Sequence, residues 1–278
     1  MIPDLTLNND ITIPQLGFGT WLVDASQATE IVGRALETGY RHIDTAQGYR
    51  NEAAIGKALS ASGISRKDLF ITSKLNNSNH KTEDVLASFD KTLEDLETDY
   101  LDLFLIHWPL PMHYGGDLAS PWKAMIELLK SGRIRAIGVS NFEPEHLEQI
   151  IDATGVVPAV NQIEAHPYFP NNPARTWCRE HGIEIEAWGP LAQGEILGDP
   201  IAAEVGLQYG KTCAQVVLRW HIQRGDIIFP KSMSPERMQQ NLNIFDFELS
   251  AADMLKIDGL DRGEAGRVGP HPNEFDSI

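Results

Sequence analysis

The sequence is poor in cysteine, in basic residues and in long apolar runs. Its 278 residues include only two cysteines, Cys178 and Cys213, which are too few for a disulfide framework. Both fall in helical patterns, so we expect free thiols in a reducing, cytoplasmic compartment. The 23 Lys and Arg residues against 39 Asp and Glu residues leave a formal net charge of −16, which argues against nucleic acid or an anionic membrane as a partner. No apolar stretch approaches the about 20 residues that cross a bilayer, and residues 1–4 lack the basic and apolar segments of a signal peptide.

The glycine-rich turn of dinucleotide-binding open sheets, GxGxxG, is also missing. Its nearest approximation is Gly17-Phe18-Gly19, where Leu22 stands in place of the third glycine. A doubly wound open sheet normally carries that turn after its first strand. Its absence therefore favours the other parallel α/β layout, a closed barrel.

Short apolar strands alternate with amphipathic helical patterns along the whole chain. The apolar residues between the strands recur with helical spacing, as in Ala28, Ile31, Val32, Ala35 and Leu36. The expected strands are Leu16–Gly19, His42–Asp44, Phe70–Lys74, Leu101–His107, Ile134–Ser140, Val160–Glu164, Glu184–Trp188 and Ile227–Pro230. Eight strands that are each followed by a helix predict a (β/α)8 TIM barrel, which typically needs about 250 residues.

Both ends of the chain add small elements to this barrel. Residues 5–13 read as a β-hairpin that turns through Asn8-Asn9-Asp10. A last helix, Ser250 to Asp258, precedes a Gly- and Pro-containing tail over residues 262–278. No repeat, low-complexity tract or linker interrupts the sequence, so we expect one domain over residues 1–278.

Ionisable side chains close three consecutive strands. Asp44, Lys74 and His107 each follow an apolar run, and Tyr49 lies in the loop after Asp44. The C-terminal ends of barrel strands share one face, so these four side chains should converge there. A lysine that closes a buried strand is costly unless it is paired, and pairing with Asp44 would place its charge beside the phenol of Tyr49. The four residues are therefore a candidate proton-transfer set.

Taken singly, each of these residues has a structural explanation. Asp44 could cap the next turn, and Tyr49 could pack as an ordinary loop aromatic. Lys74 could reach solvent, and His107 could be a hydrogen-bonded core histidine. The hypothesis of a shared chemistry depends on all four occurring together.

This arrangement resembles the aldo-keto reductase family, from QLGFGTW at residues 15–21 to PKSMSPERMQQN at residues 230–241. The tail GRVGPHP, residues 266–272, is most similar to the bacterial 2,5-diketo-D-gluconate reductases. The resemblance implies NADPH-dependent reduction of small aldehydes and ketones, including diketo-sugar acids, with a hydride from the nicotinamide and a proton from Tyr49. His107 would orient and polarise the carbonyl. We expect no metal, and a monomer.

A phosphate site is indicated near residue 234 by local sequence. Ser234 as N-cap and Pro235 as first helical residue mark a helix start, which lies beside Lys231 and Arg237. A solvated basic helix end is the alternative. The resemblance implies that this segment holds the 2′-phosphate and adenine of NADPH. The full set of implied cofactor residues is Ser140, Asn141, Gln162, Trp188, Gly189, Leu191, Gln193, Gly194, Lys231, Ser232, Met233, Ser234, Arg237, Gln240 and Asn241.

The residues assigned to the nicotinamide also have structural explanations: Ser140-Asn141 could cap a helix, and Trp188 could be a core residue. The short loop over residues 190–198 suggests a loosely belted cofactor. For the substrate, the resemblance implies aromatic walls at Trp21 and Trp108, with residues 109–120 and the tail as the rim. Asn76 stands where the bacterial relatives carry tryptophan, which predicts a wider or more polar pocket.

Two other functions compete with carbonyl reduction. A non-catalytic subunit of the same fold would bind NADPH and regulate a partner, but it would not need Lys74 beside Tyr49. A cofactor-independent isomerase could grip a phosphate with Lys231 and Arg237, but Asn141, Gln162 and Trp188 would then lack a common purpose. A reductase explains both groups of residues.

Overall fold

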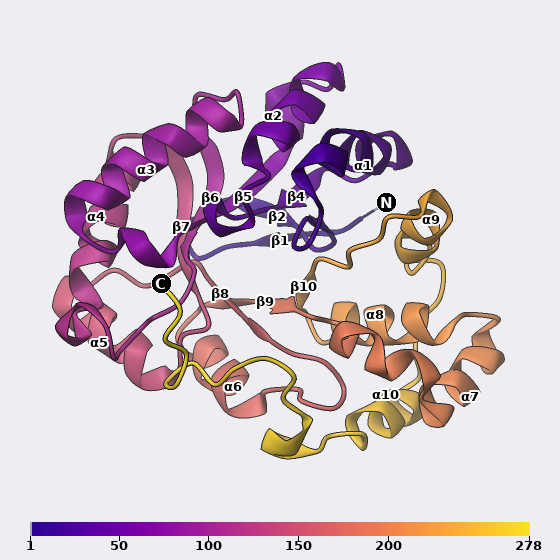
Figure 1. Ribbon diagram of the computed structural model, residues 1–278. Coiled ribbons are helices and arrows are strands. Elements are labelled where there is room, and N and C mark those ends of the chain that lie inside the picture. The colour runs from indigo at the N-terminus through magenta and orange to yellow at the C-terminus, as the bar shows by residue number, and fades with distance from the viewer. Residues whose placement is uncertain (1) are drawn as a thin grey trace.

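The structure, a computed structural model, describes residues 2–278. Eight parallel strands lie side by side in chain order, and the helices form a ring outside them (Figure 1). The strands are β3 (Phe18–Gly19), β4 (His42–Asp44), β5 (Phe70–Leu75), β6 (Leu101–Ile106), β7 (Ile134–Ser140), β8 (Val160–Glu164), β9 (Glu184–Trp188) and β10 (Ile227–Ile228). All eight coincide with expected strands, so the (β/α)8 prediction is confirmed.

The barrel closes where its first and last strands meet. Leu16 forms a parallel bridge with Ile228, whose amide N donates to Gln15 O at 3.0 Å and whose carbonyl accepts from Gly17 N at 2.9 Å. A Cβ on Gly17 would lie 2.7 Å from the Phe229 ring, and one on Gly19 would lie 2.8 Å from Phe229 O. Both positions of the Gly-Phe-Gly segment therefore need glycine for close strand packing, and the segment is unrelated to a dinucleotide turn.

The two strands at this seam are shorter than expected. The first was predicted from Leu16 and the last to Pro230, but the regular ladders cover only Phe18–Gly19 and Ile227–Ile228. Their mutual pairing is a single bridge, and each pairs regularly only with its other neighbour, so the outer residues leave the ladder. Two smaller differences concern β5, which continues one residue past Lys74, and β6, which ends before His107.

The helices cover the barrel with their apolar faces inward, as the helical spacing predicted. The predicted apolar stripe of the first helix is buried, namely Ala28, Ile31, Val32, Ala35 and Leu36. The helices are α1 (Ala25–Thr38), α2 (Glu52–Ala61), α3 (Thr82–Asp95), α4 (Ala119–Lys130), α5 (Pro144–Thr154), α6 (Asn172–Glu180), α7 (Pro200–Tyr209), α8 (Cys213–Gln223), α9 (Pro235–Leu242) and α10 (Ala251–Asp258). None within residues 2–278 is long and apolar enough to cross a membrane.

The N-terminal hairpin closes the bottom of the barrel. Strands β1 (Asp4–Thr6) and β2 (Thr12–Pro14) pair antiparallel, and their turn residues Asn8 and Asn9 donate to Pro158 O and Arg135 O, both at 2.9 Å. Ile13 of this hairpin packs with barrel-interior residues such as Phe70 and Leu103. The open end of the barrel is therefore the opposite, C-terminal face.

The C-terminal tail crosses that open face. In Figure 1 its yellow trace runs from α10 past α6. Glu164, at the end of β8, accepts from the backbone amides of Val268 (2.6 Å) and Gly269 (2.9 Å). At the far end, Asn77 Nδ2 donates to Ser277 O at 2.8 Å. The tail thus spans the mouth of the barrel.

Candidate active site

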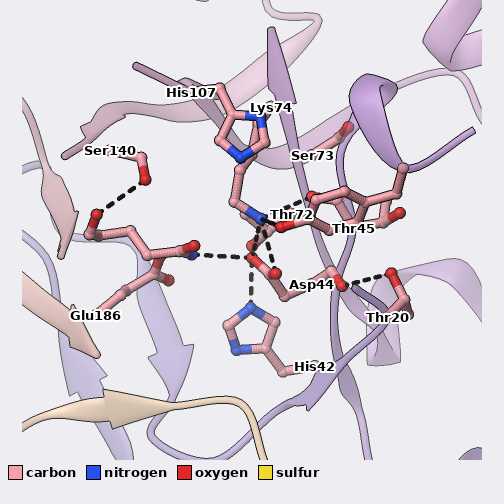
Figure 2. A network of polar contacts seen from close by, with 12 residues as sticks. Thr20, His42, Asp44, Thr45, Thr72, Ser73, Lys74, His107, Ser140 and Glu186 are labelled. Carbon is pink, nitrogen blue, oxygen red and sulfur yellow. Dashed lines mark hydrogen bonds and ion pairs between the residues drawn. The ribbon is translucent and has the colours of Figure 1, made fainter. Parts of the chain in front are cut away.

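The four predicted proton-transfer residues meet at the C-terminal ends of β4, β5 and β6. Figure 2 shows three of them, Asp44, Lys74 and His107. Asp44 is the last residue of β4, Lys74 lies near the end of β5, and His107 directly follows β6. Tyr49 ends a short 3₁₀ helix, Gln47–Tyr49, which continues into α2 after the left-handed residue Arg50. Convergence follows from parallel strand ends sharing one face, as the sequence predicted.

Lys74 is fully buried and bound on several sides. Its Nζ donates to Asp44 Oδ1 at 2.7 Å, to Asp44 Oδ2 at 2.9 Å and to Thr45 O at 2.9 Å. Burial opposes the charge of this ammonium group, but Asp44, Tyr49 and Glu186 together outweigh burial and keep the pKa of Lys74 raised. Lys74 is therefore a fixed positive charge, and the solvated alternative does not apply.

The phenol of Tyr49 lies close to the positive charge of Lys74. Lys74 Nζ lies 3.4 Å from the phenol oxygen and 5.0 Å from the ring centroid. Burial raises the pKa of Tyr49 above its usual 10.0, and Lys74 acts against that rise. Lys74 lowers the pKa of the phenol, as expected, but burial raises that pKa by more, so the net shift is upward. The phenol is thus protonated and poised to donate.

His107 faces Tyr49 as a neutral group. Their rings meet edge to face with centroids 5.7 Å apart. Burial, followed by the charge of Lys74, lowers the pKa of His107 to about 3. A neutral imidazole can donate one N–H to a carbonyl oxygen but cannot compete as the proton donor. Of the two rings, only the Tyr49 phenol could therefore supply a proton to a carbonyl oxygen.

The residues assigned to the nicotinamide end form a hydrogen-bonded chain beside the four. Trp188 Nε1 donates to Asn141 Oδ1 at 2.7 Å, and Asn141 Nδ2 donates to His107 O at 2.9 Å. Ser140 Oγ donates to Gln162 O at 2.9 Å. The N-cap of α5 is Glu143, so Ser140 and Asn141 are not a helix cap. Asn141 adopts a left-handed conformation, φ 62°, which turns its side chain into this chain.

The residues assigned to the phosphate end surround the start of α9. Ser234 is its N-cap, Pro235 is its first residue, and the Ser234 hydroxyl accepts from Arg237 N. Lys231, Met233 and Arg237 are exposed, and neither cation forms an ion pair within residues 2–278. Ser232 and Asn241 are buried beside them, and Gln240 is half-buried. This end combines two uncommitted cations with a helix N-terminus.

The remaining cofactor candidates lie in the loop after β9. Gly189, Gln193 and Gly194 have positive φ values of 61°, 52° and 101°, and Leu191 is the N-cap of a 3₁₀ segment over Ala192–Gly198. This loop joins the end of Trp188 to α7. These four residues therefore follow Trp188 closely along the chain.

The predicted substrate residues are arranged unequally around the mouth. Trp21 is 50% exposed, whereas Trp108 is 9% exposed and stacks on Phe275 of the tail with centroids 4.1 Å apart. Asn76 is half-buried, and its Oδ1 would lie 3.2 Å from a Cβ built on Gly48. Phe275 was missed from sequence, where the only signal was a lone aromatic after GPHPNE. The tail therefore contributes an aromatic to the rim.

Glu186 is a second residue that the sequence reasoning missed. It lies in the middle of β9, fully buried, and Gln162 Nε2 donates to its Oε2 at 2.8 Å. The available signal was an acidic residue between two apolar ones, Ile185 and Ala187, inside the expected strand. Glu186 can be seen below Ser140 in Figure 2, facing the Asp44–Lys74 pair.

Comparison with known proteins identifies the family. The model of the Aldo/keto reductase family matches residues 15–262. This chain belongs to the aldo/keto reductase family. It is 45% identical over 270 residues to the glyoxal reductase of Bacillus subtilis, covering 97% of this chain and 96% of that protein. It is 42% identical over 277 residues to the methylglyoxal reductase DkgA of Escherichia coli, covering 98% and 97%.

A solved structure agrees with this assignment. A variant of the protein Gox0644 in complex with NADPH matches with a TM-score of 0.95 and 42% identity, covering 99% of each chain. The family resemblance seen in the sequence is thus confirmed, and the isomerase alternative is excluded. The two relatives are named for the reduction of glyoxal and methylglyoxal. Their names therefore do not support the finer resemblance to the 2,5-diketo-D-gluconate reductases.

Proposed function

We propose that this aldo/keto reductase uses NADPH to reduce small aldehydes and ketones, with Tyr49 as the proton donor. The observation that supports it most directly is the fixed Lys74 ammonium, which lies between the Asp44 carboxylate and the Tyr49 phenol. The names of the relatives favour short dicarbonyl compounds such as glyoxal and methylglyoxal as substrates. Diketo-sugar acids, suggested by the tail motif, are the second substrate class. A monomeric, cytoplasmic protein stays a prediction.

The residues present fit a bound NADPH at both of its ends. Lys231, Arg237 and the first turn of α9 offer charge-assisted donors for a 2′-phosphate. Gln162 Oε1 accepts no hydrogen bond from residues 2–278, and it remains accessible to solvent. It is thus an acceptor available to a carboxamide N–H. Bound NADPH would supply a hydride to the carbonyl carbon, and the protein's own residues would do the rest.

Those residues divide the work on the carbonyl oxygen. Tyr49 donates its phenolic proton as negative charge develops there, and Lys74 stabilises the phenolate that remains. His107, neutral near pH 7, donates an N–H that orients the carbonyl. Asp44 keeps Lys74 in place and charged. The partly exposed position of Tyr49 and His107 lets a substrate reach them from the mouth.

The test is Tyr49→Phe, which keeps the ring and removes the proton. We expect the reduction of methylglyoxal to slow by about 10²- to 10⁴-fold, the usual worth of a general acid. The affinity for NADPH, measured by fluorescence, should change by less than a few-fold. Tyr100→Phe, at the opposite end of the barrel, is the matched control and should leave turnover unchanged. Near wild-type turnover in Tyr49→Phe would refute the assignment.

The same assay addresses the non-catalytic alternative. A regulatory subunit would bind NADPH yet fail to oxidise it with glyoxal, methylglyoxal, simple aldehydes or keto-sugars. Comparing kcat/KM across this panel also decides between the two substrate classes. A preference for keto-sugar acids over short dicarbonyls would support the diketo-gluconate resemblance.

A further inference from the structure

Glu186 is a carboxyl group inside the barrel for which the proton-transfer set has no direct use. Its side chain is completely buried, and its Oε1 has no hydrogen-bond partner within residues 2–278. A buried carboxyl is costly, and replacing it by an apolar residue would ordinarily improve a barrel core. The contacts of its second oxygen, Oε2, indicate what this buried carboxyl group does.

That other oxygen binds Gln162, its direct neighbour in the β8–β9 register. Gln162 Nε2 donates one hydrogen to Glu186 Oε2 at 2.8 Å and one to Asp44 Oδ2 at 2.9 Å. A primary amide nitrogen has two hydrogens, so both are committed. The two acceptors come from different strands: Asp44 ends β4, and Glu186 lies on β9, the direct neighbour of β8. Figure 2 shows both acceptor residues.

This arrangement determines which way the amide of Gln162 faces. Flipping the amide would place Oε1 against the Asp44 carboxylate, and it would replace two buried hydrogen bonds by at most one, donated by a protonated Glu186. The stable orientation leaves Oε1 with no partner from residues 2–278 and with access to solvent. Only this orientation offers an acceptor, rather than a donor, to a ligand at the mouth.

We propose that Glu186 is a positioning residue that orients the amide of Gln162, so that its oxygen accepts from the carboxamide N–H₂ of the nicotinamide. The inference rests on the proposed function, because it presumes NADPH at this site. Asp44 alone supplies one of the two anchors and is already bound by Lys74. Glu186 supplies the second anchor, and burial raises the pKa of this carboxyl to about 8, so it acts mainly as a neutral acceptor at pH 7.

Glu186→Met tests the proposal, because methionine fills similar space without an acceptor. Glu186→Gln is the matched control, since its side-chain oxygen can still accept from Gln162. The readout is binding by fluorescence of three probes: NADPH, 2′,5′-ADP, which lacks nicotinamide, and the 3-acetylpyridine analogue of NADPH, which lacks the carboxamide N–H₂. Binding needs no turnover, so failure of the reductase assay and failure of this proposal are distinguishable.

We expect wild type and Glu186→Gln to bind NADPH about 3- to 10-fold more tightly than the acetylpyridine analogue, the usual worth of one hydrogen bond. In Glu186→Met this preference should vanish, while 2′,5′-ADP binds unchanged. Gln162→Met should abolish the preference as well, and the double variant should lose no more than either single one. Additive losses, or an intact preference in Glu186→Met, would overturn the proposal. If Glu186→Met does not fold, Glu186→Leu, which also has no acceptor, is judged by the same criteria.

Discussion

Glu186 also makes a prediction about stability that depends on the direction of its pKa. Burial raises this pKa from 4.5 to about 8 in the folded protein, and the nearby Asp44 adds to the rise, while Gln162 and Lys74 oppose it. Between these values the folded state holds a proton that the unfolded state has lost. The contribution of Glu186 to the free energy of unfolding is therefore complete below pH 4.5 and is lost as the pH rises toward 8.

The size of this effect follows from the same values. One pKa unit corresponds to about 1.4 kcal/mol. The rise from 4.5 to about 8 therefore changes the free energy of unfolding by at most about 5 kcal/mol over the whole titration. Glutamine at this position does not titrate and keeps the shape of the neutral carboxyl. Between pH 5 and pH 8 the free energy of unfolding of wild type should therefore fall by about 3 to 4 kcal/mol more than that of Glu186→Gln.

The assay is urea unfolding at constant ionic strength at pH 5, 6.5 and 8, with the slope of each curve checked for constancy. Other buried groups titrate in the same range, notably Glu52, whose pKa burial raises to about 7, but they do so in both proteins and cancel in the difference. Glu148→Gln, an exposed carboxyl on α5, controls for net charge. Parallel curves for wild type and Glu186→Gln would refute the reasoning and mean that Glu186 is ionised when buried.

Three further predictions concern the site itself. Asp44→Asn leaves Lys74 buried without its counter-charge, so the pH profile of the reduction rate should move and stability should fall by about 3 to 5 kcal/mol; an unchanged profile would contradict the Asp44–Lys74–Tyr49 chain. His107→Ala should slow small and bulky carbonyl substrates alike, and selective damage to bulky ones would make His107 a pocket wall. Arg237→Ala should weaken NADPH binding by about 10- to 100-fold and leave NADH nearly unaffected, because charge-assisted bonds to a phosphate are worth about 1.5 to 3 kcal/mol. Gln239→Ala on the same exposed helix is its control, and equal losses for both cofactors would show that Arg237 supports the fold or the adenine instead.

The sequence alone determined which segments form the barrel and where its chemistry lies. Short apolar runs and helical spacings are local properties, so the eight strands and the buried stripe of α1 could be predicted from neighbouring residues. The start of α9 at Ser234-Pro235 followed from capping chemistry in the same way. Because parallel barrel strands end on one face, residues at strand ends, such as Asp44 and Lys74, converge once the fold is known.

The tertiary structure decided which partners those residues have and how strongly burial acts on them. Gln162 is 118 residues from Asp44 along the chain, and Glu164 is 105 residues from Gly269, so no local pattern announced either hydrogen bond. The net rise in the pKa of Tyr49 likewise depends on how much of the packed barrel surrounds the phenol. Desolvation and long-range pairing are properties of the packed interior, which is why the buried Glu186 and the aromatic contact between Trp108 and Phe275 appeared only in three dimensions.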